Sequence, residues 1–307
     1  MSEPLPAPTL ASYLRERCGR ELMHAWRLLS DGAGDRDAAV HEGRKCVRRV
    51  RAWLRLAPGT VRAELKTIDA DLRNVRRILG PLRDAHTRIE AIGKLRKRRD
   101  LGELGVWLTD ARKRLKAVLA ARWLRRPAHG RAWRQMLDRL HALAVSVPDW
   151  PLESILPKHA QRAVRRGFSR ARAARTECAG RTGTELRHDW RGRVRILVLQ
   201  CQLLEGFGVL PGSRELKDLG QGLGDEHDLA VVSRELGRLE LPVDVKQALR
   251  RYLYQQRIAL ALRNDRSARD SLRSSRAPKL RKIRASRPEL PQTPVEPSDD
   301  ASPVGVS

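Results

Sequence analysis

The sequence is poor in aromatic side chains, which make up 4% of its 307 residues and include only two Phe and three Tyr. Proteins that bind single-stranded nucleic acid usually stack bases on such side chains. Seven Trp are present, but most, such as Trp53 and Trp190, fall on or near apolar stripes, where we expect them to be core residues. The composition therefore weighs against a surface built for base stacking.

Cysteines are also few. Cys18, Cys46, Cys178 and Cys201 form no C-x-x-C pair, which argues against a zinc site or a disulfide framework. No apolar run approaches the roughly 18 residues that a membrane-spanning helix needs, and the N-terminus lacks the basic and apolar regions of a signal peptide. We expect a soluble cytoplasmic protein that has no membrane partner.

The common nucleotide and nucleophile motifs are missing as well. The chain has no G-x-x-x-x-G-K-[ST] loop, no G-x-G-x-x-G turn and no G-x-S-x-G elbow. Gly220, Gly222 and Gly224 fall in "DLGQGLGDEH", but no strand precedes them, so we interpret them as a helix–helix turn. We therefore expect no nucleotide cofactor.

Basic residues are present in large excess. The chain has 63 Lys and Arg against 36 Asp and Glu, a formal net charge of +27. Charge of one sign works against a compact fold and attracts polyanions. Nucleic acid, an anionic membrane surface and an inorganic polyanion are the classes of partner that such a charge admits.

The pattern of apolar residues predicts an all-α protein. Leu, Ala and Arg dominate and favour helices, apolar residues recur every three or four positions, and no segment alternates as a strand would. A hydrophobic content of 41% argues against global disorder. We expect helices near 9–29, 37–57, 60–79, 83–99, 105–124, 130–145, 155–178, 184–207, 213–223, 227–239 and 243–272.

The helical region falls into two similar parts. We predict an N-terminal extension at 1–8, a first helical bundle at 9–145, a linker at 146–151, a second bundle at 152–272, and a disordered tail at 273–307 that is basic and then Pro-rich. The stretch 39–56 matches 185–202 when His41 is set against His188, and 79–92 matches 223–236 with Asp84 against Asp228. The offsets of 147 and 144 residues are nearly equal, which favours an internal duplication over chance similarity of Arg-rich helices.

The stretch 39–55 concentrates cations beside an apolar stripe. The stripe consists of Val40, Gly43, Val47, Val50, Leu54 and Ala57, and it is followed one residue later by His41, Arg44, Arg48, Arg51 and Arg55. One residue is about 100° of helical rotation, so the cations flank the core-facing side and line a cleft. The second repeat has the same pattern, with Trp190, Val194, Leu197 and Cys201 followed by His188, Arg191 and Arg195.

The cations of such a stripe repel one another, and a nearby anion is needed to offset this repulsion. Like charges three or four residues apart on a helix repel by about 0.2–0.5 kcal/mol per pair, and the next segment adds more arginines. We infer that the relieving partner is a polyanion outside the chain, bound through forked, charge-assisted contacts. The alternative is that the arginines only cover helix surfaces with their long stems.

These motifs resemble the CHAD family, the conserved histidine α-helical domain. The resemblance rests on H-x-x-R-K-x-x-R-R-x-R from His41, on Arg83–Asp84 after Leu79–Gly80, on His188, and on Leu223–Gly224 followed by Asp228; it covers about residues 9–270. It implies two pseudo-symmetric helical bundles around a basic central cleft or channel, inorganic polyphosphate as the ligand, and association with polyphosphate granules. Polyphosphate has a charge on every unit and no bases, which suits a site rich in cations and poor in aromatics.

On this basis we expect non-catalytic binding of polyphosphate. The expected binding residues are His41, Arg44, Lys45, Arg48, Arg49, Arg51, Arg73, Arg76, Arg77, Arg83, His188, Arg191, Arg193 and Arg195. Each His would donate to a phosphate oxygen and bind better when protonated, or else serve in packing or capping. Asp84 and Asp228 would cap a helix or orient a cleft arginine.

Other functions stay open. The charge also fits a nucleic-acid-binding protein, although no clear recognition module is present. His188, His227, Asp228 and Asp244 can be matched to the ligands of metal-dependent HD-type phosphohydrolases, but arginines crowd His188, whereas metal sites usually concentrate acids. We expect no metal. The oligomeric state is left open, and the basic run from Arg266 to Arg287 either extends the polyanion site or has no dedicated partner.

Overall fold

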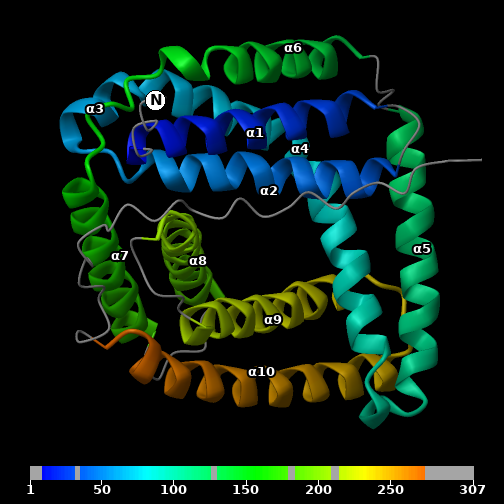
Figure 1. Ribbon diagram of the computed structural model, residues 1–307. Helices are drawn as coiled ribbons and strands as arrows, with labels where there is room; N and C mark the ends of the chain where they lie inside the picture. Colours follow the sequence, from blue (N-terminus) through cyan, green and yellow to red (C-terminus); the bar gives the residue numbers. More distant parts are fainter. Residues whose placement is uncertain (1–8, 32–34, 126–129, 179–183, 209–213, 274–307) are drawn as a thin grey trace, which may run out of the picture.

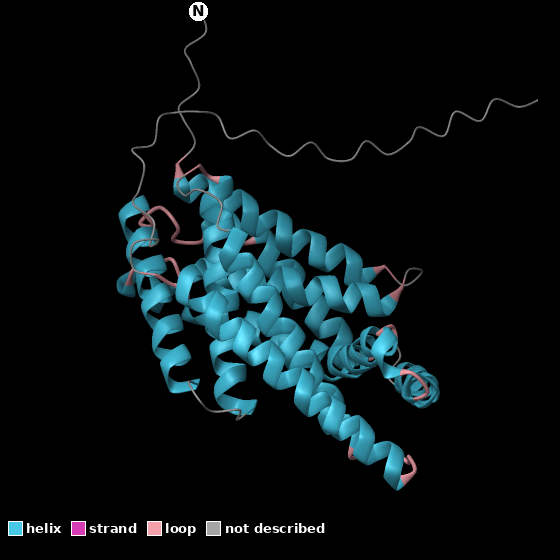
Figure 2. Cartoon of the chain, turned by 90° about the horizontal axis from the view of Figure 1, so that it is seen from below, coloured by secondary structure: helices cyan, strands magenta, loops and turns pink. Residues whose placement is uncertain are grey.

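The computed structural model describes residues 9–31, 35–125, 130–178, 184–208 and 214–273. Within these ranges the chain is all-α, as predicted, with ten α-helices, two 3₁₀ helices and no strand (Figure 2). The α-helices are α1 (Leu10–Ser30), α2 (Arg36–Leu54), α3 (Gly59–Glu64), α4 (Lys66–Arg96), α5 (Leu104–Arg125), α6 (Arg131–Val145), α7 (Pro157–Cys178), α8 (Thr184–Gly206), α9 (Arg214–Leu236) and α10 (Val243–Ser271). The 3₁₀ helices are η1 (Arg99–Leu101) and η2 (Val147–Asp149). The predicted extension at 1–8 and the tail from 274 lie outside the described residues.

The helix that carries the first basic stripe begins at a side-chain cap. Asp35 accepts hydrogen bonds from the backbone N–H groups of Asp37 and Ala38 at 2.9 and 3.1 Å, and a cap of this kind stabilises a helix by about 1 kcal/mol. The predicted apolar stripe of α2, from Val40 to Ala57, is buried throughout, and so is the stripe of α8 from Trp190 to Cys201. Both stripes face the main hydrophobic core, as predicted.

Two predicted helix breaks are wrong. α4 runs unbroken through Pro81, where the sequence predicts separate helices at 60–79 and 83–99, and α9 runs unbroken through the predicted turn at Gly220–Gly224. Leucines on both sides of each site are buried in the core, so tertiary packing outweighs the poor helix propensity of Gly and Pro. The chain breaks instead at Leu65, between α3 and α4.

The helices of the two halves pack in a similar order. α1 packs on α2, α2 on α4 and α4 on α5; likewise α7 packs on α8, α8 on α9 and α9 on α10. The two sets meet where α2 contacts α8 and α4 contacts α9. In Figure 1, α8 lies between the layer of α1, α2 and α6 and the layer of α9 and α10, with α5 and α7 at the sides. The similar order agrees with the predicted duplication, which, like the domain boundaries, stays a prediction.

Reciprocal hydrogen bonds join the two central helices. The Trp53 indole Nε1 donates to the Leu199 carbonyl at 3.1 Å, and the Gln200 amide Nε2 donates to the Ala52 carbonyl at 3.0 Å. In the register that sets His41 against His188, Trp53 corresponds to Gln200 and Ala52 to Leu199. Each bond is therefore the counterpart of the other, and together they fix the crossing of α2 and α8.

Candidate functional site

Six arginines come together between α2, α4 and α8. Arg44 and Arg48 are on α2, Arg76 and Arg83 on α4, and Arg191 and Arg195 on α8; we call them the central arginine cluster. Burial lowers the pKa of Arg48 to about 9, helped by the charges of Arg195, Arg76, Arg44 and Arg83. Positive charges on one α8 residue and on two α4 residues therefore lie close enough to act on one α2 side chain.

Three members of the cluster make no direct contact with an acceptor or a carboxylate in the described part of the chain. Among the described residues, Arg48, Arg191 and Arg195 have no hydrogen-bond or ion-pair partner, and the buried Nε atoms of Arg48 and Arg191 are left without an acceptor. Burial and neighbouring arginines lower the pKa of both Arg191 and Arg195 to about 10. All three remain charged at neutral pH, so the arrangement is one that a bound anion would stabilise.

Arg44 is held at a defined place on α4. Its Nη1 donates to the carbonyl oxygen of Arg76 at 3.2 Å, while the Nε atoms of Arg44 and Arg76 are buried without a partner in the described part of the chain. Burial lowers the pKa of Arg44, Asp84 opposes this change, and Arg83 adds to it. One guanidinium edge is thus fixed against the helix backbone while the group keeps donors unused.

Asp84 and Asp228 do not cap helices, because both lie in helix interiors. The capping role predicted for them is wrong, and the alternative interpretation, that they orient arginines of the site, stays a prediction. Asp84 favours the charged form of Arg44, and Asp228 favours those of Arg191 and Arg195. Asp228 also accepts a hydrogen bond from Lys94 at 2.9 Å, which ties α9 to α4.

The histidines lie beside the arginines and are kept neutral. Burial, then Arg83 and Lys45, lower the pKa of His41 to about 4, and its Nδ1 is buried without a partner in the described structure. His188 faces His227, with 3.5 Å between their Nδ1 atoms. Burial, Arg191 and the neighbouring His188 lower the pKa of His227 to about 3, so neither ring of the pair readily takes a proton.

Several other predicted contact residues have carboxylate partners within the chain. The pairs are Lys45 with Glu42 at 3.0 Å, Arg49 with Glu21 at 2.8 Å and Glu42 at 3.1 Å, Arg51 with Asp69 at 2.6 Å, Arg83 with Glu90 at 2.7 Å, and Arg193 with Asp189 at 2.8 Å. The inference that no acid relieves the basic stripe is therefore wrong for these residues. Arg51 is buried and engaged by both Asp69 oxygens, so its first role is to hold α2 on α4.

Arg73 and Arg77 lie on the outer side of α4. Both are exposed; Arg73 lies 3.6 Å from Asp69, and Arg77 donates to the Asn74 side chain at 2.9 Å. Neither acts on the pKa of a member of the central cluster. The structure thus does not bring Arg77 to the cluster, and it places Arg73 at a neighbouring pocket.

This neighbouring pocket is basic, has a volume of about 580 Å³, and lies at the end of α2, where α3, α4, α7 and α8 meet. We call it the α3–α7 pocket. Its charged lining consists of Arg51, Arg55, Arg62, Lys66, Arg73, Arg166, Arg170 and Arg193, with Asp69 as the one acid. Arg62 and Arg170 both lower the pKa of Arg55, which shows that these cations crowd one another. Arg55 belongs to the predicted cation stripe but not to the expected binding residues, and the sequence analysis misses Arg62, Lys66, Arg166 and Arg170. The spacing of Arg166 and Arg170, one helical turn apart, was the available signal.

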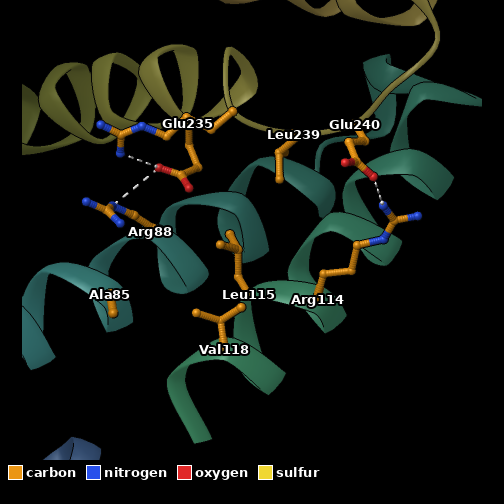
Figure 3. Close-up of a pocket in the computed structure, with 9 residues that line it drawn as sticks. Ala85, Arg88, Arg114, Leu115, Val118, Glu235, Leu239 and Glu240 are labelled. Atoms are coloured by element: carbon orange, nitrogen blue, oxygen red, sulfur yellow. Dashed lines mark hydrogen bonds and ion pairs between the residues drawn. The ribbon is translucent and has the colours of Figure 1, made fainter. Parts of the chain in front are cut away.

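A second pocket has a different chemistry (Figure 3). It has a volume of about 440 Å³ and lies between α4, α5 and the end of α9, with Ala85, Leu115, Val118 and Leu239 as its apolar lining. Its charged residues are paired with one another: Arg88 and Arg238 contact Glu235 at 3.4 and 3.3 Å, and Arg114 lies 3.9 Å from Glu240. This pocket offers an anion no unpaired cluster of cations.

The metal-ligand set that the HD pairs suggested is not assembled. His188 and His227 do face each other, but in the described ranges no three His, Cys, Asp or Glu side chains are placed to hold a metal ion. The described helices also include none long and apolar enough to cross a bilayer.

The CHAD domain family matches residues 17–237, which include α2, α4, α8 and α9 and hence the whole central arginine cluster. The chain belongs to the CHAD family. Comparison with curated proteins gave no match.

Two solved structures share the CHAD fold of this chain. The CHAD domain from the plant Ricinus communis aligns with a TM-score of 0.55 at 19% identity, covering 90% of this chain and 95% of that one. PptA from Streptomyces chartreusis aligns with a TM-score of 0.58 at 16% identity, covering 86% of this chain and 99% of that one. At such identities the likeness concerns the fold alone.

Proposed function

We propose that this CHAD protein binds inorganic polyphosphate, without catalysis, along the central arginine cluster. The observation that carries the proposal is that three largely buried arginine side chains converge without a direct partner among the described residues. They are Arg48, Arg191 and Arg195. A bound phosphate chain would supply negative charge and could accept hydrogen bonds from the Nη groups of these arginines, and guanidinium groups favour forked contacts of this kind. Family membership supports the same ligand.

The cations form a continuous path, which suits a linear polymer. Arg44 and Arg55 both act on the pKa of Arg76, and Arg170 acts on that of Arg55. The charges therefore follow one another from the central cluster to the α3–α7 pocket. A polymer with one charge per unit can contact them in sequence, and each contact releases counterions. The protein would accordingly be found with polyphosphate granules in the cytoplasm.

Nucleic acid is the second candidate, and the net charge of +27 supports it. The aromatic side chains of the central helices do not favour it, because Trp53 and Trp190 are buried in the core and offer no face for base stacking. Polyphosphate should therefore outcompete nucleic acid at equal charge.

The test is a binding titration with long-chain polyphosphate over a series of salt concentrations, with duplex and single-stranded DNA as competitors. Wild type is compared with Arg44→Glu/Arg48→Glu, and with Arg131→Glu/Arg134→Glu as a control of equal charge on the exposed face of α6. We expect tight binding that resists DNA, is lost in the α2 variant and persists in the α6 variant. Equal competition by DNA and equal weakening of both variants would instead indicate a generic basic surface.

A further inference from the structure

An unusual pair of residues interrupts the sequence pattern of α4 beside the site. Gly80 and Pro81 stand in the interior of this helix, and they are the two residue types that helix interiors tolerate least. Proline also has no N–H to donate to the carbonyl of Arg77, four residues earlier. α4 nevertheless stays helical there, so the two residues are retained at a cost to local stability.

Gly80 is where Arg44 approaches the backbone of α4. A Cβ atom at position 80 would lie 3.3 Å from Nη1 of Arg44, closer than side chains normally pack. The same Nη1 donates to the carbonyl of Arg76 at 3.2 Å, one turn before Gly80 on the same helix. The guanidinium group thus occupies the space that a side chain at position 80 would need.

The equivalent position in the second half is different. Gly224 corresponds to Gly80 in the predicted repeat, yet a Cβ at Gly224 would meet no atom within 4 Å. Arg191, the counterpart of Arg44, has no hydrogen-bond or ion-pair partner within the described part of the chain. Of these two equivalent glycines, only Gly80 leaves space that an arginine guanidinium occupies.

We propose that Gly80 is a positioning residue, which sets the guanidinium of Arg44 against α4 so that its free edge faces the phosphate chain. This inference rests on the proposed polyphosphate function. Gly80 itself makes no ligand contact: it acts through Arg44, and a side chain there would push the guanidinium off the Arg76 carbonyl and toward the other cations of the cluster.

The experiment compares Gly80→Ala and the bulkier Gly80→Leu with the matched controls Gly224→Ala and Gly224→Leu. Polyphosphate affinity and the thermal unfolding midpoint are measured for all four variants. We expect affinity to fall about 3-fold in Gly80→Ala and about 10-fold in Gly80→Leu, the loss of a charge-assisted contact, while the Gly224 variants bind as wild type does. Ala is a better helix former than Gly, so the unfolding midpoint of Gly80→Ala should equal or exceed that of wild type. A merely structural glycine would lose stability and affinity together.

A double-mutant cycle with Arg44→Ala tests whether Gly80 acts through Arg44. In the Arg44→Ala background, Gly80→Ala should leave affinity unchanged. Equal losses with and without Arg44, or wild-type affinity in both Gly80 variants, would overturn the proposal.

The ¹⁵N side-chain resonance of Arg44, assigned with Arg44→Lys, gives a readout that needs no ligand. It should move in Gly80→Ala and stay in place in Gly224→Ala. If wild type binds no polyphosphate, the proposed function fails, and the resonance alone then decides whether Gly80 positions Arg44; an unmoved resonance refutes that as well.

Discussion

The two halves of the protein place different kinds of residues at one pair of equivalent core positions. In the predicted register, Val40 and Leu82 of the first half correspond to Arg187 and Glu226 of the second. Val40 and Leu82 are buried in the main hydrophobic core. Arg187 and Glu226 are equally buried but form an ion pair, with 2.5 Å between Nε and the carboxylate. Two apolar residues in one half thus take the place of a buried salt bridge in the other.

In the central arginine cluster the two halves agree instead. Arg44 and Arg48 have arginine counterparts in Arg191 and Arg195, although these charges repel and the chain gives them little compensation. At this pair of core positions the two halves differ in chemistry, whereas the positions of Arg48 and Arg195 carry, in both halves, a charge without a direct partner among the described residues. This difference is what the proposed binding of a ligand by the central arginine cluster would lead us to expect.

The largest effect is expected where one partner of the buried pair is removed. Glu226→Leu leaves the Arg187 charge buried with only Asp265, at 3.1 Å, as a carboxylate partner, and it also strands Asn264, which donates to Glu226 at 2.9 Å. We expect a loss of about 3–5 kcal/mol in the free energy of unfolding, measured by urea denaturation.

The double variant Arg187→Val/Glu226→Leu introduces the residue pair of the first half and removes the unpaired Arg187 charge. It should therefore recover part of this loss, although Asn264 still lacks its Glu226 acceptor. Val40→Ala/Leu82→Ala, which empties the corresponding positions without introducing a charge, serves as the comparison for lost packing alone. A double variant no more stable than Glu226→Leu would show that the two halves do not offer equivalent environments.

The next effect concerns one arginine from each half. If Arg48 and Arg195 bind the phosphate chain as proposed, Arg48→Ala and Arg195→Ala should each weaken polyphosphate binding about 10-fold, as for the loss of a charge-assisted hydrogen bond. Each should also raise the stability of the unliganded protein, because a repelling charge disappears. Titration of affinity and thermal unfolding of the same samples measure both effects. A large loss for one variant and none for the other would confine the site to one half.

Sequence reasoning recovered what depends on helical periodicity. The apolar stripes of α2 and α8 predict which side is buried, and the residues one position later converge in the structure, as Arg48 and Arg195 show. Partners across helix crossings were missed. Asp69 neutralises Arg51 because α4 begins where the end of α2 crosses it, and no spacing along one helix encodes that. The α3–α7 pocket was missed for the same reason, since its arginines come from different helices.

A smaller effect, on pH dependence, should separate the two histidine sites. In the folded, unliganded protein the pKa of His41 is lowered to about 4 and that of His227 to about 3, against about 6.5 in an unfolded chain. Below pH 6.5 these histidines therefore bind protons in the unfolded state but not in the folded state. Their neutral forms contribute fully to the free energy of unfolding above that pH, and this contribution falls as the pH drops toward 4. Thermal unfolding at pH 7.5, 6.5 and 5.5 measures this loss.

Burial is the main cause of both lowered pKa values, and neighbouring cations add to it. A bound polyanion should oppose the trend, because it offsets the part that comes from these cations. Polyphosphate affinity should then rise as pH falls, with proton uptake visible by calorimetry in buffers of different ionisation enthalpy. His227→Asn should reduce the uptake more than His41→Asn, because His227 faces His188 as well as Arg191, whereas Glu90 and Glu42 partly offset the charges around His41. His24→Asn, on the exposed side of α1, is the control. If polyphosphate affinity does not change between pH 6 and pH 8 in any variant, the histidines do not take part in binding.

The smallest effect is expected at the paired hydrogen bonds between α2 and α8. Trp53→Phe removes the donor to Leu199, and Gln200→Met removes the donor to Ala52. The Leu199 carbonyl lies in the interior of α8 and keeps its helical partner, whereas the Ala52 carbonyl lies in the last turn of α2, where the Leu56 N–H bonds to Trp53 instead. Each bond should contribute about 1 kcal/mol to the free energy of unfolding, with an added cost for the unpaired Ala52 carbonyl in Gln200→Met and for the lost ring packing in Trp53→Phe. Urea denaturation of the two variants should give losses within about 2 kcal/mol of each other. Because the bonds set the crossing that brings Arg48 beside Arg195, polyphosphate affinity should fall slightly in both variants. A loss of stability and affinity in only one of the two variants would mean that a single bond maintains the crossing. The two bonds would then not be equivalent parts of a symmetric pair.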